Sequence, residues 1–300
     1  MITIRTVSAT DFTAPLSQEA YLAEMAAIQS AAVESAEMGA KTAAFWKMEN
    51  LSAAFLKNST PGQSLNDPRM PVEIRPISHC GMGIAAVEVS GFQANRLAQI
   101  IDGFSNPEYR LFAYEGAGAM MSLYQPDWFG FVARCFSLLG ILPMASLSKP
   151  DDLAFLQAFD PEIQRLIAHG YGRMLYFKNH NIAAAISAAR RSRAYRFDAC
   201  VQGIAFAYSM VNNGDLHRVF RAGRNRLHAE AGRAFCDGLT YAIEFWEWMA
   251  PGFISSFKPM DAFERALLKA ARDGVAASRE RGPLLPFALE RAGAAALKSI

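Results

Sequence analysis

The chain has 300 residues, of which 52% are hydrophobic and 19% are charged, and its formal net charge is +2. This length fits one or two domains, and this composition supplies enough apolar residues for a large core. The small net charge argues against a nucleic-acid-binding protein, because such proteins usually concentrate a strongly basic face.

The N-terminal part, residues 1–75, predicts a helical cap followed by a loop. Residues 1–16 show no regular pattern and lack the apolar segment of a signal peptide. A helical pattern runs from Ser17, its expected N-cap, to about Lys57, with a break near Gly39. A loop rich in proline, asparagine and serine follows. We expect these helices to cover the end of the following domain.

A small-x-small step recurs between residues 76 and 257, the expected repeat domain. The steps lie at Gly81 and Gly83, Gly116 and Gly118, Gly170 and Gly172, and in looser form at Gly203 and Gly238. A spacing of roughly 35 residues, with amphipathic segments in between, is typical of stacked α/α repeats. We therefore expect an all-α fold: an array of about five α/α helical-hairpin repeats, solenoid or toroid-like, behind the N-terminal helical cap.

Two interpretations of the glycine step remain open. We expect each step at the start of a helix. In the first interpretation, a neighbouring helix approaches closely there, and this packing offsets the low helix propensity of glycine. In the second interpretation, the protic residues beside the steps line the rim of a pocket, and the helix N-termini favour an anion there.

The protic residues beside the steps are the candidate catalytic residues of this sequence. They are His169, Glu115, Tyr114, His79 and Tyr171. General acid–base chemistry is what these residue types suit best, with His169 and Glu115 first. The sequence contains no HExxH, Walker or GxSxG motif, so it predicts neither a metal nor a cofactor.

The longest interval between steps predicts an insertion at about 125–160. Residues 128–147 are the most hydrophobic part of the chain and leave three alternatives: a buried helix, a peripheral membrane or homodimer contact, or a membrane span. Arg134 and Pro143 interrupt the segment, whereas a span needs about 20 clean apolar residues. Asp151 is the expected N-cap of a following helix rather than part of an acidic metal-binding motif.

The remaining features concern the C-terminal half and the cysteines. Residues 241–257 are strongly aromatic and form either a core-closing helix or one wall of an apolar pocket. Residues 258–300 predict a C-terminal helix and a tail. The basic cluster 190–196 is interpreted as a solvated helix end. The four cysteines form no CxxC pair, which indicates reduced thiols in a cytoplasmic protein.

Three segments of the repeat domain carry a family resemblance. They are FAYEGAGAM at 112–120, HGYGRMLYF at 169–177 and GIAFAY at 203–208. In this order they resemble the FAYEGA-type, QGLGRSLWF and GLACAY segments of a bacterial family catalogued as a domain of unknown function. Members of this family often occur with enediyne and other polyketide biosynthesis genes.

The resemblance covers roughly residues 75–242 and has clear departures. His169 stands where the family usually has glutamine, Val201 replaces a glycine, and residues 1–70 have no counterpart. The resemblance implies a helical protein of specialised metabolism that handles a hydrophobic polyene or polyketide-like molecule. It assigns no catalytic residue.

These observations together predict a natural-product biosynthesis enzyme whose partner is a large hydrophobic small molecule. Acid–base residues in an apolar pocket would promote a cyclisation, an isomerisation or a related rearrangement. Two alternatives remain: a non-catalytic carrier of a lipophilic intermediate, and a helical-repeat scaffold that binds another protein on its concave face.

Overall fold

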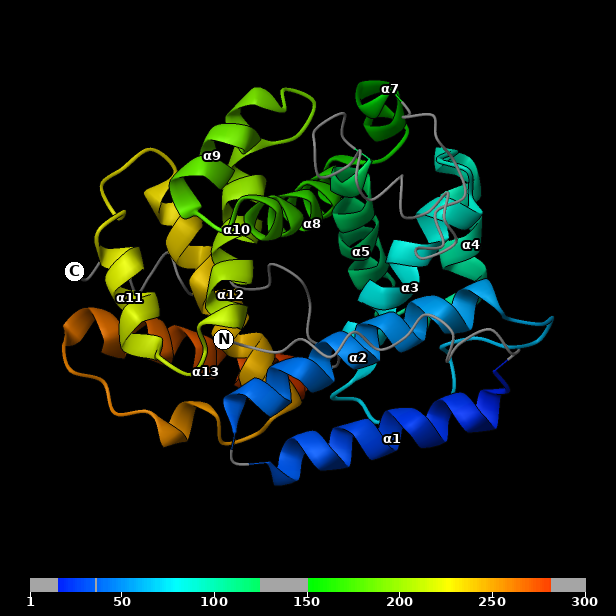
Figure 1. Cartoon of the computed structure of the whole chain (residues 1–300), viewed down its shortest axis with the longest axis horizontal. Coiled ribbons are helices and arrows are strands. Elements are labelled where there is room, and N and C mark those ends of the chain that lie inside the picture. Colours follow the sequence, from blue (N-terminus) through cyan, green and yellow to red (C-terminus); the bar gives the residue numbers. More distant parts are fainter. Residues whose placement is uncertain (1–15, 36, 125–150, 282–300) are drawn as a thin grey trace.

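The computed structural model describes residues 16–35, 37–124 and 151–281 (Figure 1). Every regular element of these residues is a helix and none is a strand, which confirms the all-α prediction. Among them, no helix combines the length and the apolar character that crossing a membrane requires. The segment 128–147, for which a buried helix, a peripheral membrane or homodimer contact and a membrane span are the alternatives, lies outside the described residues, as does most of the predicted insertion.

Two helices precede the glycine steps. They are α1 (Gln18–Glu34) and α2 (Met38–Lys57), which lie side by side. The Ser17 hydroxyl accepts a hydrogen bond from the backbone N–H of Ala20, as predicted for an N-cap. The chain leaves the helical conformation around Ser35, whereas Gly39, the predicted break, lies inside the first turn of α2.

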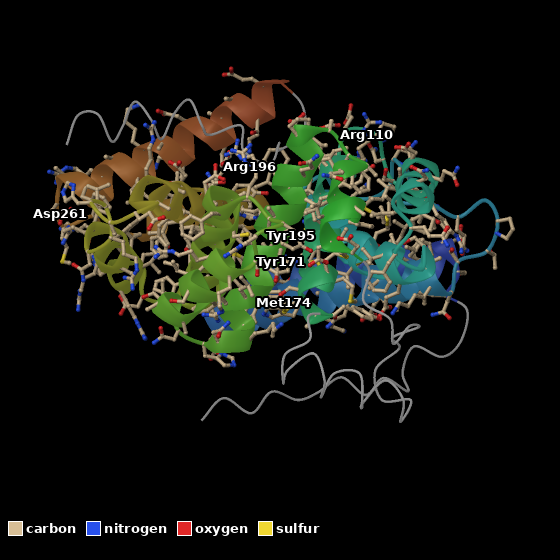
Figure 2. The ribbon with its side chains drawn as sticks, turned by 90° about the horizontal axis from the view of Figure 1, so that it is seen from above. Arg110, Tyr171, Met174, Tyr195, Arg196 and Asp261 are labelled. Atoms are coloured by element: carbon tan, nitrogen blue, oxygen red, sulfur yellow. The ribbon has the colours of Figure 1, made fainter. Side chains whose placement is uncertain are left out.

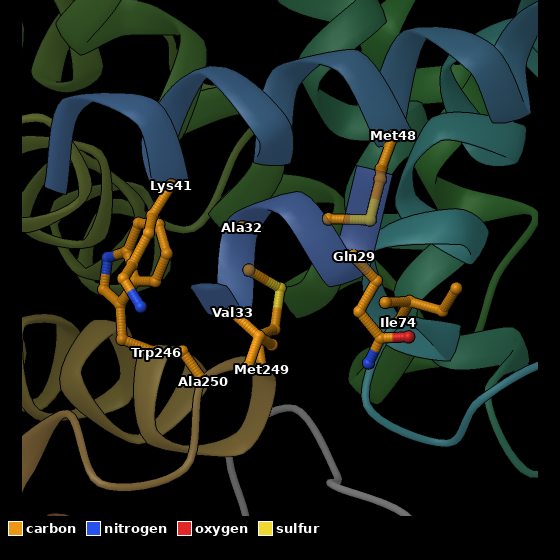
Figure 3. Close-up of a pocket in the computed structure, with 9 residues that line it drawn as sticks. All are labelled: Gln29, Ala32, Val33, Lys41, Met48, Ile74, Trp246, Met249 and Ala250. Atoms are coloured by element: carbon orange, nitrogen blue, oxygen red, sulfur yellow. The ribbon is translucent and has the colours of Figure 1, made fainter. Parts of the chain in front are cut away.

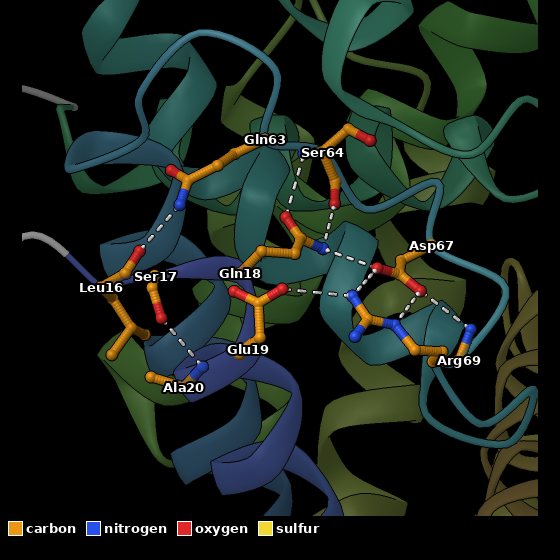
Figure 4. A network of polar contacts seen from close by, with 9 residues as sticks. All are labelled: Leu16, Ser17, Gln18, Glu19, Ala20, Gln63, Ser64, Asp67 and Arg69. Carbon is orange, nitrogen blue, oxygen red and sulfur yellow. Dashed lines mark hydrogen bonds and ion pairs between the residues drawn. The ribbon is translucent and has the colours of Figure 1, made fainter.

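A polar network ties the start of α1 to the loop that follows α2 (Figure 4). The side-chain amide of Gln18 donates to the carbonyl oxygen of Ser64, and the Gln63 amide donates to the carbonyl oxygen of Leu16. Arg69 forms an ion pair with Asp67 at 2.7 Å. These contacts hold the first part of the loop against the start of α1.

Five helices carry the glycine steps. They are α3 (Arg75–Val89), α5 (Arg110–Leu123), α8 (Pro161–Asn179), α10 (Phe197–Val211) and α12 (Gly232–Met249). Each packs against the next in this order, and α2 packs against α3. Most residues of these helices are buried, because each helix has neighbours on more than one side.

Shorter helices complete the described part of the chain. They are α4 (Ala94–Phe104), α7 (Asp152–Gln157), α9 (Ile182–Arg191) and α11 (Leu216–Arg224), followed by the 3-10 turn η2 (Ile254–Ser256) and by α13 (Ala262–Arg281). The Asp151 carboxylate accepts hydrogen bonds from two backbone N–H groups of α7, so the predicted N-cap is confirmed.

The aromatic residues of α12 belong to the core. The Phe245 ring packs against Phe45 of α2, Phe112 of α5 and Phe206 of α10, with centroids 5.7–6.4 Å apart. One helix thus contacts three others through one side chain. Cys80, Cys200 and Cys236 are free and buried, in agreement with the prediction for these three; Cys135 lies outside the described residues.

Candidate functional site

The glycine steps bring neighbouring helix backbones into direct contact. A Cβ atom added at Gly116 would lie 1.9 Å from the carbonyl oxygen of Cys80, and one at Gly203 would lie 1.9 Å from that of His169. No side chain fits at such distances. The close-packing interpretation of the steps is therefore correct, and it fixes Cys80 and His169 at helix interfaces.

The position of the steps within the helices differs from the prediction. Gly81, Gly116, Gly203 and Gly238 each lie six residues after the first residue of their helix, and Gly170 lies further inside α8. The prediction that they begin helices is wrong, because close packing overrides the low helix propensity of glycine. The residues before the steps are consequently in helix interiors, where no helix N-terminus stabilises an anion.

Glu115 of α5 and His169 of α8 meet inside the protein. The Nδ1 atom of His169 lies 3.3 Å from Oε1 of Glu115, and the two side chains are 0% and 2% exposed. The hydroxyl of Tyr241, on α12, donates to the other carboxylate oxygen of Glu115 at 3.4 Å. Three helices thus bring an imidazole, a carboxylate and a phenol together, and the first two belong to the candidate residues of the sequence analysis.

The surroundings of Glu115 favour its ionised form. Burial raises the pKa of this carboxyl, but His169, Arg173 and the Tyr241 hydroxyl together outweigh burial and hold the pKa below its usual range. Burial and the neighbouring Glu115 raise the pKa of Tyr241 well above its ordinary value. At neutral pH the site therefore holds a carboxylate that accepts a hydrogen bond from a neutral phenol.

A buried ion pair lies one helical turn from His169. The Nη2 atom of Arg173 donates to Oε1 of Glu49, on α2, at 2.8 Å. Burial disfavours the charge of Arg173, but Glu49, Cys80 and Glu115 raise its pKa, so the guanidinium stays charged. Burial also raises the pKa of Glu49, and Arg173 opposes this shift. The two pairs form one charged cluster in the core.

Cys80 and Glu244 complete the cluster as neutral groups. Burial, followed by the charge of Glu115, raises the pKa of the Cys80 thiol well above its usual value, so the residue is not a thiolate nucleophile. Glu244 lies on α12, three residues after Tyr241. Neither of its carboxyl oxygens has a hydrogen-bond partner among the described residues, and burial raises its pKa well above the ordinary value.

His79 does not join this cluster. Its Nδ1 atom lies 2.7 Å from the carbonyl oxygen of Arg75, and its Nε2 atom accepts a hydrogen bond from the backbone N–H of Asn106 at 2.9 Å. Burial lowers the pKa of His79 to about 4, so the ring is neutral at pH 7. The ring thereby joins α3 to the turn before α5.

The two predicted tyrosines also lie apart from the pair. Tyr171 and Tyr195, both labelled in Figure 2, stack with ring centroids 3.8 Å apart. The Tyr171 hydroxyl shares a hydrogen bond with Ser192. The Tyr114 ring packs edge-on against Phe159, and burial raises the pKa of Tyr114 to about 12. Of the five predicted residues, the structure therefore joins only Glu115 and His169.

Sequence reasoning missed the other members of the cluster. Arg173 follows His169 by four residues inside an apolar run, which places both side chains on one helix face and is a readable signal. Tyr241 and Glu244 are three residues apart on α12, a spacing that also places two side chains on one helix face. Glu49 gave no local signal, because only the packing of α2 on α3 brings it to the cluster.

Aromatic side chains surround the acid–base pair and close it from solvent. The Phe206 ring lies 5.5 Å from the His169 ring and 5.1 Å from the Tyr241 ring. A small pocket between α1, α2 and α12 is lined by Met48 and Trp246 (Figure 3), but its volume is about 10 Å³ and it does not border the pair. The pair is thus a polar site enclosed by aromatic rings.

The described residues contain no group of three or more histidine, cysteine, aspartate and glutamate side chains that could hold a metal ion. The donors that the cluster does offer are already engaged: Glu49 with Arg173, and Glu115 with His169 and Tyr241. The arrangement suits the transfer of a proton better than the coordination of a cation.

Comparison of the chain with models of protein families, with curated proteins and with solved structures gives no match. The site is therefore interpreted from its own geometry.

Proposed function

We propose that the chain is an array of α/α repeats in which α3, α5, α8, α10 and α12 form the inner row. Support comes from the order of packing along this row and from the identical position of the glycine in four of the five helices. The helices α4, α9 and α11 follow α3, α8 and α10, and would be the outer partners. The hairpin of α1 and α2 would be the N-terminal cap.

In this proposal the protein is a natural-product biosynthesis enzyme that acts on a large hydrophobic, polyketide- or polyene-like substrate. The observation that carries the proposal is the Glu115–His169 pair, 3.3 Å apart among aromatic rings. Perturbed ionisable groups that converge in an apolar site are typical of active sites. The resemblance of residues 112–120, 169–177 and 203–208 to a family found with polyketide genes agrees with this substrate class.

The chemistry is a proton shift that leads to isomerisation or cyclisation. The Glu115 carboxylate removes a proton from one position of the substrate. This proton passes to the ring of His169, which returns it to a second position and leaves Glu115 ionised again. Tyr241 holds the carboxylate in place, and the ion pair between Arg173 and Glu49 fixes the turn of α8 that follows His169.

The substrate must reach a site that is closed in this structure. Phe206 and Phe245 are the side chains whose rotation would open space beside His169 and Tyr241, because both pack on this group. An apolar substrate would replace their ring contacts with its own. The proposal thus assigns these two rings to substrate binding and the polar pair to chemistry.

The test begins with native mass spectrometry of protein purified from its own cells, followed by extraction and identification of the bound small molecule. Turnover of that molecule is then compared between the wild type and the variants Glu115→Gln and His169→Asn. Loss of an acid–base group typically costs about 10²–10⁴-fold in rate, so both variants should fall by at least about 100-fold.

The chain provides a matched control. His217 and Glu264 form a second histidine–glutamate pair at 3.2 Å, between α11 and α13. The variants His217→Asn and Glu264→Gln should keep wild-type turnover. Full turnover by Glu115→Gln and His169→Asn would remove these two residues from the proposed chemistry. A bound small molecule that the wild type does not convert would indicate a carrier, and a bound polypeptide without a small molecule would indicate a scaffold.

A further inference from the structure

A surface pocket lies between α9, α10 and the segment that leads into α12. Its volume is about 220 Å³. Its apolar side is formed by Ile186, Val201 and Phe235, the last two of which are almost fully buried. Its polar side carries Arg190 and Glu230. The pocket therefore has an apolar floor and a charged mouth, and it is separate from the Glu115–His169 site.

The wall formed by residues 226–232 has a fixed shape. Ala231 has a φ of +57°, a left-handed conformation that costs a residue with a side chain on the order of 1–3 kcal/mol. A Cβ added at Gly232 would lie 2.0 Å from the carbonyl oxygen of Arg226, so the backbone doubles back on itself here. Such strained backbone persists only where the surrounding structure determines it, and it is frequent at ligand sites.

The charge at the mouth is positive. Arg190 also lines an adjoining depression together with Ser187, Arg191 and Arg193. Arg191 and Arg193 take part in no ion pair among the described residues, and Glu230 alone among the residues that line the two hollows carries a negative charge. In addition, α12 begins at this wall without a side-chain cap, which adds the positive end of a helix dipole.

We propose that this pocket binds an anionic amphiphile, that is, an apolar chain that carries a carboxylate or phosphate group. The end of the chain would lie between Ile186 and Phe235, and the head would contact Arg190, Arg191 and Arg193. A volume of about 220 Å³ is below the roughly 300–1,000 Å³ of sites that enclose a whole ligand, so the head stays at the surface.

The proposed orientation of the ligand, with its chain in the pocket and its head at the surface, distinguishes a free amphiphile from a lipid of a bilayer. A lipid within a bilayer presents its head outward and keeps its chain in the membrane, whereas this pocket takes the chain and leaves the head beside the arginines. The ligand is therefore a free molecule rather than a membrane surface.

Glu230 has a defined role in this arrangement. It forms an ion pair with Arg190 at 2.5 Å, and the side chains are 64% and 58% exposed. Exposed pairs of this kind are weak, so an anionic head can replace Glu230 as the partner of Arg190. The carboxylate thus competes with the ligand, and its removal should increase the affinity.

Octyl phosphate, octanol and inorganic phosphate are suitable probes, titrated into the full-length protein by calorimetry at low ionic strength. We expect octyl phosphate to bind at least about tenfold more tightly than either comparison, because only it satisfies both halves of the pocket. Equal affinity for octanol, or equal affinity for inorganic phosphate, would contradict the proposal.

Variants locate the binding on the pocket. The double variant Arg191→Ala, Arg193→Ala should weaken octyl phosphate binding by about tenfold or more. Arg221→Ala removes an exposed arginine of α11 and should leave the affinity unchanged. Ala183→Trp should fill the pocket, while Ala184→Trp, at the next exposed position of α9, should leave binding unchanged. Glu230→Gln should strengthen binding. Thermal unfolding confirms that each variant is folded.

Two further results would overturn the inference. The first is an affinity for octyl phosphate that is the same in Ala183→Trp as in the wild type. The other is arginine-dependent binding to vesicles of phosphatidylglycerol without binding of octyl phosphate, which would assign the arginines to a membrane surface. Neither result bears on Glu115 and His169, because those residues lie in the core.

Discussion

Gly170 of α8 lies directly against the backbone of Glu115 on α5: a Cβ added at Gly170 would be 1.7 Å from the Glu115 carbonyl oxygen. The residue before Gly170 is His169, and its ring reaches the Glu115 side chain across the same interface. The contact that brings the two helices together is thus the contact that forms the acid–base pair. The close packing of the two helices and the contact between the two side chains both depend here on one missing methyl group.

Gly170→Ala should therefore destabilise the protein. The added methyl group forces two backbones apart, and overpacking of this kind costs typically about 1–3 kcal/mol. Gly103→Ala is the matched control, because Gly103 lies in α4 with no atom within 4 Å of an added Cβ. That substitution should increase stability by up to about 1 kcal/mol, since alanine favours the helix. Urea unfolding measures the free energy of unfolding of both variants. Equal changes would show that the contact between Gly170 and Glu115 does not contribute to stability.

The Arg173–Glu49 pair gives a second prediction. Arg173→Met leaves the Glu49 carboxyl buried without its cation, which costs on the order of 3–5 kcal/mol in known cases. Replacement of both residues, Arg173→Met with Glu49→Gln, removes both charges and should recover much of that loss. Urea unfolding of the wild type, the two single variants and the double variant gives the coupling energy. Simple additivity of the two single effects would show that the residues do not interact.

The position of the acid–base pair was predictable because the glycine steps put Glu115 and His169 in equivalent places. Both residues directly precede a step, and helices that pack through their steps bring these positions together. The helix boundaries were not predictable in the same way. Glycine has low helix propensity and suggests a boundary, whereas here it lies well inside α3 and α5, where the packing of neighbouring helices compensates for it.

The missed residues show the limit of local pattern. Arg173 could have been recognised from its place four residues after His169, but Glu49 is separated from Arg173 by 124 residues and meets it only through tertiary packing. His79 was selected because it also lies near a step. His79 lies outside the cluster, because its ring is hydrogen-bonded to the backbone of Arg75 and Asn106 instead. No sequence pattern predicts these hydrogen bonds.

Glu244 should make the protein less stable as the pH rises. Its folded pKa is raised, so the folded state holds a proton that the unfolded state releases above about pH 4.5, the ordinary value. The stabilisation is complete below that pH and is lost progressively as the pH rises through the folded pKa. Glu244→Gln cannot release a proton, so its stability should fall less steeply between pH 4.5 and 8. Parallel urea titrations test this, and identical slopes would mean that Glu244 is ionised in the folded state.

His79 should have the opposite effect at acidic pH. Its folded pKa is about 4, below the ordinary value of 6.5, so the unfolded state binds a proton that the folded state rejects. The stabilisation is present above pH 6.5 and is lost as the pH falls toward 4, by about 3 kcal/mol in total.

His79→Gln removes this dependence, because glutamine does not titrate. Compared with the wild type, the variant should lose stability at pH 7 and show a flatter profile between pH 6.5 and 4. His228→Gln is the control, since His228 is exposed and should leave the profile unchanged. Unfolding free energies measured by urea at half-unit pH steps distinguish the cases. A wild-type slope retained by His79→Gln would show that another group rejects the proton, and that burial of this ring is not the source of the pH dependence.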